Sequence, residues 1–285
     1  MTIARVEGAT AGPRWTARIA LFALVLLITA ILLHRFLGLR TPVFLTLVQL
    51  VLAAAAVSLL IGLFSAVRIW RHGGQGTARI LTGAAVSLGL LAWPLAYVPK
   101  MRQLPMINDV TTAPGNPPKF EELAGGRARP ANGAGYTAAF AVAQAAAYPD
   151  LKTMRIERSA EETFDVVQEA VRRQKLKIVR EQPPTAENDR TGVIEATDRT
   201  LIVGFYDDIA IRVGGSDSEA LVDLRSASRF GRHDFGRNAE RLRALMREIV
   251  ARLEATVSGE ARSRPAPPSA RKDADRKKGP AAPRR

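Results

Sequence analysis

The sequence contains no cysteine and only three histidines, His34, His72 and His233, among its 285 residues. Without cysteine the chain can form neither a disulfide nor a cysteine-ligated zinc or iron–sulfur site, and it has no thiol chemistry. The three histidines lie far apart in the chain, so they predict neither a histidine-rich metal site nor a Ser-His-Asp relay. We therefore expect no cofactor and no catalytic residue.

Charged residues are missing from three long apolar stretches, all of which lie before residue 100: residues 19–33, 43–67 and 80–98. About 20 apolar residues are enough to cross a bilayer core of roughly 30 Å. The stretches therefore predict three transmembrane helices within residues 19–105, after an N-terminal segment of residues 1–18. No ionisable side chain lies at the centre of any stretch, which favours an anchor over a transporter.

The basic residues beside these stretches predict their orientation. Six lie on the side of the N-terminus and four on the opposite side. Because basic loops stay in the cytoplasm, we expect a cytoplasmic N-terminus and, after three spans, a soluble domain in the periplasm of a bacterial inner-membrane protein. The six are Arg5, Arg14, Arg18, Arg68, Arg71 and Arg79, and the four are Arg35, Arg40, Lys100 and Arg102.

The net charge of +14 does not come from the soluble domain. Residues 106–260 hold 22 basic and 24 acidic side chains, whereas residues 261–285 hold 9 and 2. We therefore expect no specific nucleic-acid partner for the domain. The segment of residues 259–285 has no large apolar side chain and is predicted to be a disordered basic tail. Such a tail could contact anionic lipid, envelope polymers or nucleic acid, or it could have no dedicated partner.

Hydrophobic patterns after the apolar stretches predict a small α+β domain over residues 151–258, preceded by a connecting segment of residues 106–150 that is rich in Pro and Gly. Ser159 and Glu162 have the spacing of a capping box, which predicts the start of a helix. Strands are expected at residues 176–179, at 192–197 paired with 201–205, and at 208–213 paired with 219–228. An apolar stripe over residues 239–253 predicts a last helix. This order favours an antiparallel sheet covered on one face by two helices.

Residues 223–238 are much denser in hydrogen-bonding groups than a link between a strand and a helix requires. The guanidinium groups of Arg225 and Arg229 are suited to bind a carboxylate or phosphate, and the following helix N-terminus would add backbone donors. In the structural alternative, Arg225 pairs with Asp223 or Asp207, and Asp234 caps the helix. The candidate ligand-binding residues are Arg225, Ser226, Ser228, Arg229, Asp234, Asn238 and Arg241.

A weaker candidate is a metal site built from acidic residues. Asp207, Asp208 and Asp223, with Glu195 and Asp234 nearby in the predicted sheet, could supply oxygen ligands for a hard cation. No spacing matches a calcium-binding loop, and nothing in the sequence places a nucleophile within reach of His233.

Several short motifs resemble the family named domain of unknown function 1499, over about residues 106–252. They include residues 107–112, 117–120 and 148–150, and residues 204–209. The most specific ones are Arg225-Ser-Ala-Ser-Arg-x-Gly231 and Asp234-x-Gly-x-Asn238, with Arg241. The resemblance implies a protein of the bacterial envelope or attached to a membrane, with relatives in plastids, and it implies no substrate.

These observations together predict an integral membrane protein whose periplasmic domain is a binding or structural module of the cell envelope. The expected partners are the lipid bilayer and envelope polymers or another envelope protein. One alternative is a metal-dependent hydrolase that uses the acidic cluster. Another is a cytoplasmic domain whose tail binds anionic lipid or nucleic acid.

Overall fold

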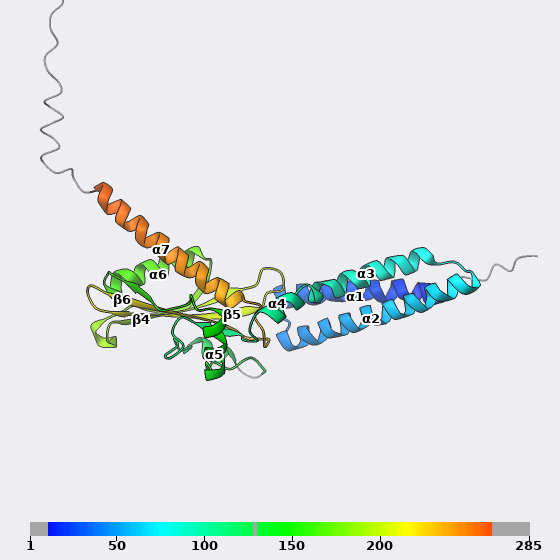
Figure 1. The fold of residues 1–285 in the computed structure, drawn as a ribbon, viewed down its shortest axis with the longest axis horizontal. Helices are drawn as coiled ribbons and strands as arrows, with labels where there is room; N and C mark the ends of the chain where they lie inside the picture. The colour runs from blue at the N-terminus through cyan, green and yellow to red at the C-terminus, as the bar shows by residue number, and fades with distance from the viewer. Residues whose placement is uncertain (1–10, 128–129, 264–285) are drawn as a thin grey trace, which may run out of the picture.

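The computed structural model describes residues 11–127 and 130–263. Three long helices form a bundle, and a mixed domain lies beyond one end of it (Figure 1). Most of the predicted basic tail, from residue 264 onward, lies outside the described residues.

The bundle consists of α1 (Ala11–Phe36), α2 (Thr41–His72) and α3 (Thr77–Leu95), and the short helix α4 (Val98–Gln103) leads into the domain. The segments Ala11–Phe36, Thr41–His72 and Thr77–Gln103 are long and apolar enough to cross a membrane. Each contains one of the three predicted apolar stretches, so the prediction of three such helices is confirmed.

Small residues allow the three helices to pack closely. A Cβ atom added to Gly83 would lie 2.6 Å from Thr16 Cγ2, and one added to Gly62 would lie 3.0 Å from the same atom. Ser58 donates a hydrogen bond to the carbonyl of Thr16 at 2.9 Å. Large apolar side chains such as Phe64 stay exposed on the outside of the bundle, as expected for helices surrounded by lipid.

The domain is an antiparallel sheet with helices, which confirms the predicted α+β class. The strand order is β1-β6-β5-β4-β3, and β2 also pairs with β6. Figure 1 shows α6 and α7 on one face of this sheet and α5 on the other. The elements are β1 (Asp109–Thr111), η1 (Leu123–Arg127), α5 (Ala138–Ala147), β2 (Met154–Ile156), α6 (Ala160–Arg173), β3 (Lys177–Gln182), η2 (Ala186–Asn188), β4 (Thr191–Arg199), β5 (Tyr206–Gly215), β6 (Ala220–Ser228) and α7 (Arg237–Ser263).

The main core lies between the sheet and the pair α6 and α7. Ile209, Ile211 and Val213 alternate along β5 and are fully buried in this core, together with Phe164 of α6 and Leu245 of α7. The hydroxyl of Ser159 accepts a hydrogen bond from the amide of Glu162, so α6 starts where the capping pattern predicted. Helix α7 runs to Ser263 and thus extends past residue 258, the predicted end of the domain.

The segment predicted as a connector, residues 106–150, is part of the folded domain. It forms β1 at one edge of the sheet, and its Phe120 and Leu123 pack against Ala210 and Ala227 on the face opposite α6 and α7. The carboxylate of Glu195 on β4 accepts hydrogen bonds from the backbone amides of residues 121–123. Buried acceptors on the sheet therefore fix a segment whose own composition predicts irregular structure.

Residues 201–205 were predicted to be a strand, and this prediction is wrong. Strand β4 continues to Arg199 and β5 begins at Tyr206, so the residues between them form a loop. The hydroxyl of Thr200 accepts hydrogen bonds from the amides of Gly204 and Phe205, and Gly204 has a φ of +87°, a value that suits glycine. The apolar residues of this loop lie beside the bundle instead of in the sheet.

Candidate functional site

The alternation of side chains along β6 divides the predicted binding residues between the two faces of the sheet. Ser226 lies on the face covered by α7, and Arg225 lies on the opposite face, because successive side chains in a strand point in opposite directions. The structure therefore does not bring the seven candidates together as one site. They belong to two separate networks of hydrogen bonds and ion pairs.

The first network, called the helix-side network, joins Asp198, Asp207, Ser226, Ser228, Asn238 and Arg241. Asn238 Nδ2 donates to the Ser228 hydroxyl at 3.2 Å. The Arg241 guanidinium lies 2.7 Å from Asp207 Oδ2 and 2.5 Å from Asp198 Oδ2. Its Nη1 atom donates to the Ser226 hydroxyl and to Asn238 Oδ1, both at 2.9 Å. Burial lowers the pKa of Arg241, but the two carboxylates raise it by more, so the net shift is upward. The network ties β4, β5 and β6 to the first turns of α7.

Asp234 caps helix α7, as the structural alternative predicted. Its carboxylate accepts hydrogen bonds from the amides of Gly236 at 2.9 Å and Asn238 at 3.1 Å. Burial raises the pKa of Asp234, and these two bonds offset part of that effect. Phe235 and Gly236 have φ values of 56° and 81°. The Asp-x-Gly-x-Asn motif therefore forms a tight turn into the helix.

The second network, called the loop-side network, joins Asp109, Arg127, Asp208, Arg225 and Arg229 on the opposite face. Arg225 binds Asp109 through two hydrogen bonds of 2.6 and 3.0 Å. Asp208 lies 2.7 Å from Arg127 and 2.8 Å from Arg229. Apart from the partly exposed Arg229, these side chains are almost fully buried.

Four hydrogen bonds within this chain hold the guanidinium of Arg225. Besides Asp109, it donates to the carbonyls of Pro118 at 2.9 Å and Ala134 at 2.7 Å, and the Phe120 ring lies 4.4 Å away. Burial raises the pKa of Asp109, and the hydrogen bond and charge of Arg225 oppose that shift. The sequence predicted Asp223 or Asp207 as the partner of Arg225, and neither is its partner. Asp223 pairs with Arg212, and Asp207 pairs with Arg241.

The three metal candidates are likewise separated. Asp207 binds Arg241 on the helix side, Asp208 binds two arginines on the loop side, and Asp223 binds Arg212. Within residues 11–127 and 130–263, no group of three or more His, Asp or Glu side chains could hold a metal ion. Metal binding by these three aspartates stays a prediction, and the structure does not place their carboxylates together.

A contact region that no sequence pattern above predicted joins the bundle to the domain. We call it the junction: the end of α1, the start of α2 and the loop of residues 200–205. His34 Nδ1 donates to the carbonyl of Val203 at 2.7 Å, and its Nε2 accepts from the Thr41 hydroxyl at 3.0 Å. Arg35 donates to the carbonyl of Thr200 at 2.7 Å. A polar His-Arg pair that directly follows an apolar stretch was the available indication.

A pocket of about 260 Å³ lies in this region, between α2 and the domain. Part of the polar segment, residues 230–237, forms its wall. The Tyr97 ring after α3 also contacts the Phe235 ring, at 5.0 Å between centroids. The residues that line it include Leu45, Thr200, Phe205, Phe230, His233 and Arg237.

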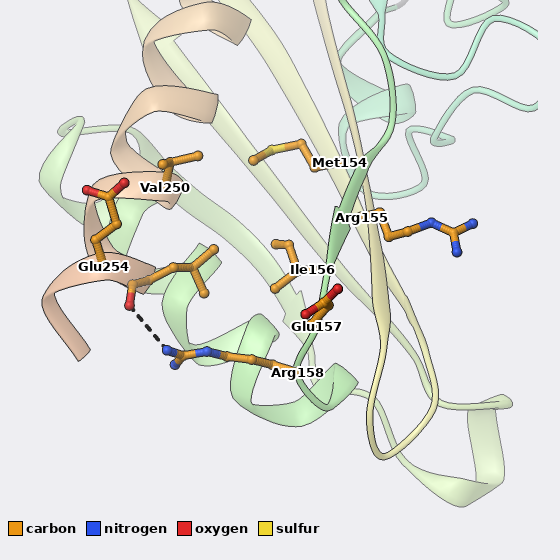
Figure 2. Close-up of a pocket in the computed structure, with 8 residues that line it drawn as sticks. Met154, Arg155, Ile156, Glu157, Arg158, Val250 and Glu254 are labelled. Atoms are coloured by element: carbon orange, nitrogen blue, oxygen red, sulfur yellow. Dashed lines mark hydrogen bonds between the residues drawn. The ribbon is translucent and has the colours of Figure 1, made fainter. Parts of the chain in front are cut away.

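A larger, more open groove of about 560 Å³ lies between β2 and the C-terminal half of α7, away from every predicted site residue (Figure 2). Met154, Ile156 and Leu253 form its apolar part. Arg158 donates to the carbonyl of Leu253 at 3.1 Å at one end. The groove offers an apolar surface but no convergent set of polar groups.

Comparison with curated proteins gives no match. A family model described as "Protein of unknown function (DUF1499)" matches residues 109–249. This range begins with β1 and ends within α7, so it contains the whole sheet and both networks. The domain of this chain therefore belongs to the DUF1499 family of proteins of unknown function.

Proposed function

We propose that this protein is an integral protein of the bacterial inner membrane whose domain faces the periplasm and serves as a binding or structural module of the cell envelope. The observation that carries the proposal is the junction. Hydrogen bonds from His34 and Arg35 attach the domain directly to the ends of the apolar helices. A domain held this way works at the membrane surface and not at the end of a free tether.

The internal pairing of the family motif supports a role other than catalysis. Arg225 forms an ion pair with Asp109 on one face of the sheet. On the other face, Arg241 forms ion pairs with Asp198 and Asp207. His233 Nδ1 accepts a hydrogen bond from the Phe235 amide at 2.8 Å, so this nitrogen is not free to act as a base. The motif residues therefore stabilise the fold and shape the wall of the pocket.

The distribution of basic residues supports the periplasmic orientation. The start of α1 and the loop between α2 and α3 lie at the end of the bundle away from the domain (Figure 1). This end holds five of the six arginines of the larger group, and such loops stay in the cytoplasm. The five are Arg14, Arg18, Arg68, Arg71 and Arg79.

Cysteine labelling tests the orientation, because the natural chain has no cysteine. Ser218→Cys places a thiol in the exposed turn between β5 and β6, and Gln75→Cys places one in the exposed loop between α2 and α3. In intact spheroplasts, a membrane-impermeant maleimide should label position 218 at once and position 75 only after lysis.

The reverse pattern would place the domain in the cytoplasm and overturn the proposal. The hypothesis of a tail that binds cytoplasmic lipid or nucleic acid would then replace it. That hypothesis predicts binding that weakens steeply with salt and is lost when residues 261–285 are removed.

A further inference from the structure

We propose that the pocket at the junction binds a phospholipid of the adjoining leaflet, with the phosphate at its polar wall and an acyl chain along α2. The inference rests on the part of the proposed function that places the bundle in a membrane. It does not depend on which side of that membrane the domain faces.

Exposed apolar residues set the level of the membrane surface. Leu201 and Ile202 in the loop between β4 and β5 are 84% and 70% exposed. The hydrogen bond from Arg35 to Thr200 holds this loop beside the end of α1, where Leu37 is also exposed. Side chains of this kind at the end of an apolar helix belong in the leaflet. Thr200 and Phe205, which flank these residues, line the pocket, so the pocket opens at the level of the headgroups.

The walls of the pocket match the two parts of a phospholipid. Leu45 on α2 is exposed and, with Phe205 and Phe230, provides an apolar wall that continues onto the lipid-facing surface of the bundle. His233 and Arg237 lie on the domain side. The volume of about 260 Å³ is below the roughly 300–1,000 Å³ of pockets that enclose a small molecule. A ligand therefore places its headgroup here and leaves its chains outside, in the bilayer.

The charge around the pocket is suited to a phosphate. Arg232 lies between two residues that line the pocket and makes no ion pair within the described residues, and Arg40 precedes the first turn of α2 and is equally unpaired. Arg237 has only a distant carboxylate, Asp198, at 3.9 Å. The two carboxylates of the pocket wall are already bonded, since Asp207 binds Arg241 and Asp234 caps α7. Among the described residues, Asp234 is held by backbone amides and not by a cation. The cations Arg40, Arg232, Arg237 and Arg241 therefore exceed the carboxylates Asp198, Asp207 and Asp234 by one positive charge.

His233 adds a hydrogen-bond donor without an acceptor. Its Nδ1 accepts from the Phe235 amide, so in the neutral ring the proton is on Nε2. That nitrogen is buried and has no hydrogen-bond partner in the described part of the chain. Buried polar groups normally have a partner. Because this nitrogen is closed to solvent, a headgroup oxygen reaches it only after the His233 ring turns towards the pocket.

Native mass spectrometry of the full chain in detergent, with added phosphatidylglycerol, tests the proposal. Two variants each alter one part of the proposed site. Arg237→Gln removes a positive charge at the polar wall, and Leu45→Trp fills the space at the apolar wall. Their matched controls are Arg247→Gln, an exposed arginine on the same helix, and Leu60→Trp, an exposed leucine elsewhere on α2. Far-UV circular dichroism melting verifies that every variant is folded.

We expect one bound phosphatidylglycerol per wild-type chain. The Kd should be about tenfold higher in each test variant and should equal the wild-type value in both controls. Diacylglycerol with the same chains, which lacks the phosphate, should bind weakly, and inorganic phosphate alone should not compete. Unchanged binding in both test variants, or equal losses in tests and controls, would overturn the proposal. The labelling experiment on positions 218 and 75 is independent, so failure here leaves the orientation intact.

Discussion

Arg225 illustrates, at the scale of single residues, why a dense polar motif need not be a ligand site. Its charge is neutralised by Asp109, and its other donors bind backbone carbonyls of residues 118 and 134. Both charged groups of the pair are buried away from water. Removing one of them leaves the other buried without a partner, which costs about 3–5 kcal/mol in buried ion pairs.

The first prediction follows from this pair. Arg225→Ala should lower the free energy of unfolding of the domain by about 3–5 kcal/mol, measured by hydrogen exchange of the sheet amides in the full chain. The control is Arg155→Ala, which breaks the exposed pair with Glu219 and should cost no more than about 1 kcal/mol. An Arg225→Ala chain of unchanged stability would return this residue to the binding hypothesis.

The second prediction concerns pH and two aspartates with opposite shifts. Burial raises the pKa of Asp234 above 3.8, so its contribution to stability is largest when it is protonated and is lost as pH rises through the folded-state pKa. The hydrogen bond from Arg243 lowers the pKa of the exposed Asp150, so its contribution is present above pH 3.8 and is lost as pH falls.

Thermal unfolding of the full chain, followed by circular dichroism between pH 3 and 8, separates these effects. The free energy of unfolding of wild type minus that of Asp234→Asn should fall as pH rises from about 4 towards 7, because the variant lacks the titrating carboxyl group. Asp150→Asn should differ most from wild type at neutral pH, by a small amount. Parallel curves for wild type and Asp234→Asn would contradict the assigned shift.

At the scale of elements, periodicity predicted what is long and locally encoded. The cap at Ser159, the stripe of α7 and the alternation in β5 and β6 are all recovered in the structure. The three-residue strands β1 and β2 are too short to show a period, and their partner is more than sixty residues away along the chain. Long-range pairs such as Asp109 with Arg225 leave no local pattern, so the division of the motif into two networks was also beyond the sequence.

The loop of residues 200–205 shows a different source of error. The mostly apolar residues 201–205 predict a strand paired with residues 192–197, because apolar residues usually face a protein core. Here Val203 packs against Phe44 and Ala30 of the bundle, while Leu201 and Ile202 are exposed. The chain therefore has a second apolar environment besides its core.

This gives the third prediction, which concerns Ile202. An environment-sensitive dye on Ile202→Cys should show blue-shifted emission in lipid nanodiscs and should be quenched by lipid-borne quenchers. The same dye on Ser218→Cys, in the turn between β5 and β6, should emit as in water. Water-like emission from position 202 would mean that the loop does not enter the leaflet.

At the scale of the whole molecule, two parts with different surroundings are joined by few contacts. His34 is central to them, since its ring binds Val203 and Thr41 and packs 4.7 Å from Phe44 and 5.3 Å from Phe205. Its Nδ1 must carry the proton, because a carbonyl can only accept. One side chain thus connects α1, α2 and the domain.

The fourth prediction tests this connection. His34→Ala should speed hydrogen exchange in residues 199–206 by about tenfold, the equivalent of about one lost buried hydrogen bond. Exchange in the central strands of the sheet should stay unchanged. His72→Ala, at the far end of α2, removes a hydrogen bond within its own helix and serves as the control. Unaltered exchange in the loop would show that the domain is held without His34.

The direction of α7 has a consequence for distance. This helix starts beside the junction and runs away from the bundle for 27 residues (Figure 1), a length of about 40 Å at 1.5 Å per residue. The domain is attached to the bundle, and α7 is packed on the domain. The helix therefore holds its C-terminal end at a fixed distance from the bundle. Ser263, the last described residue of α7, thus lies a few tens of ångströms from the junction.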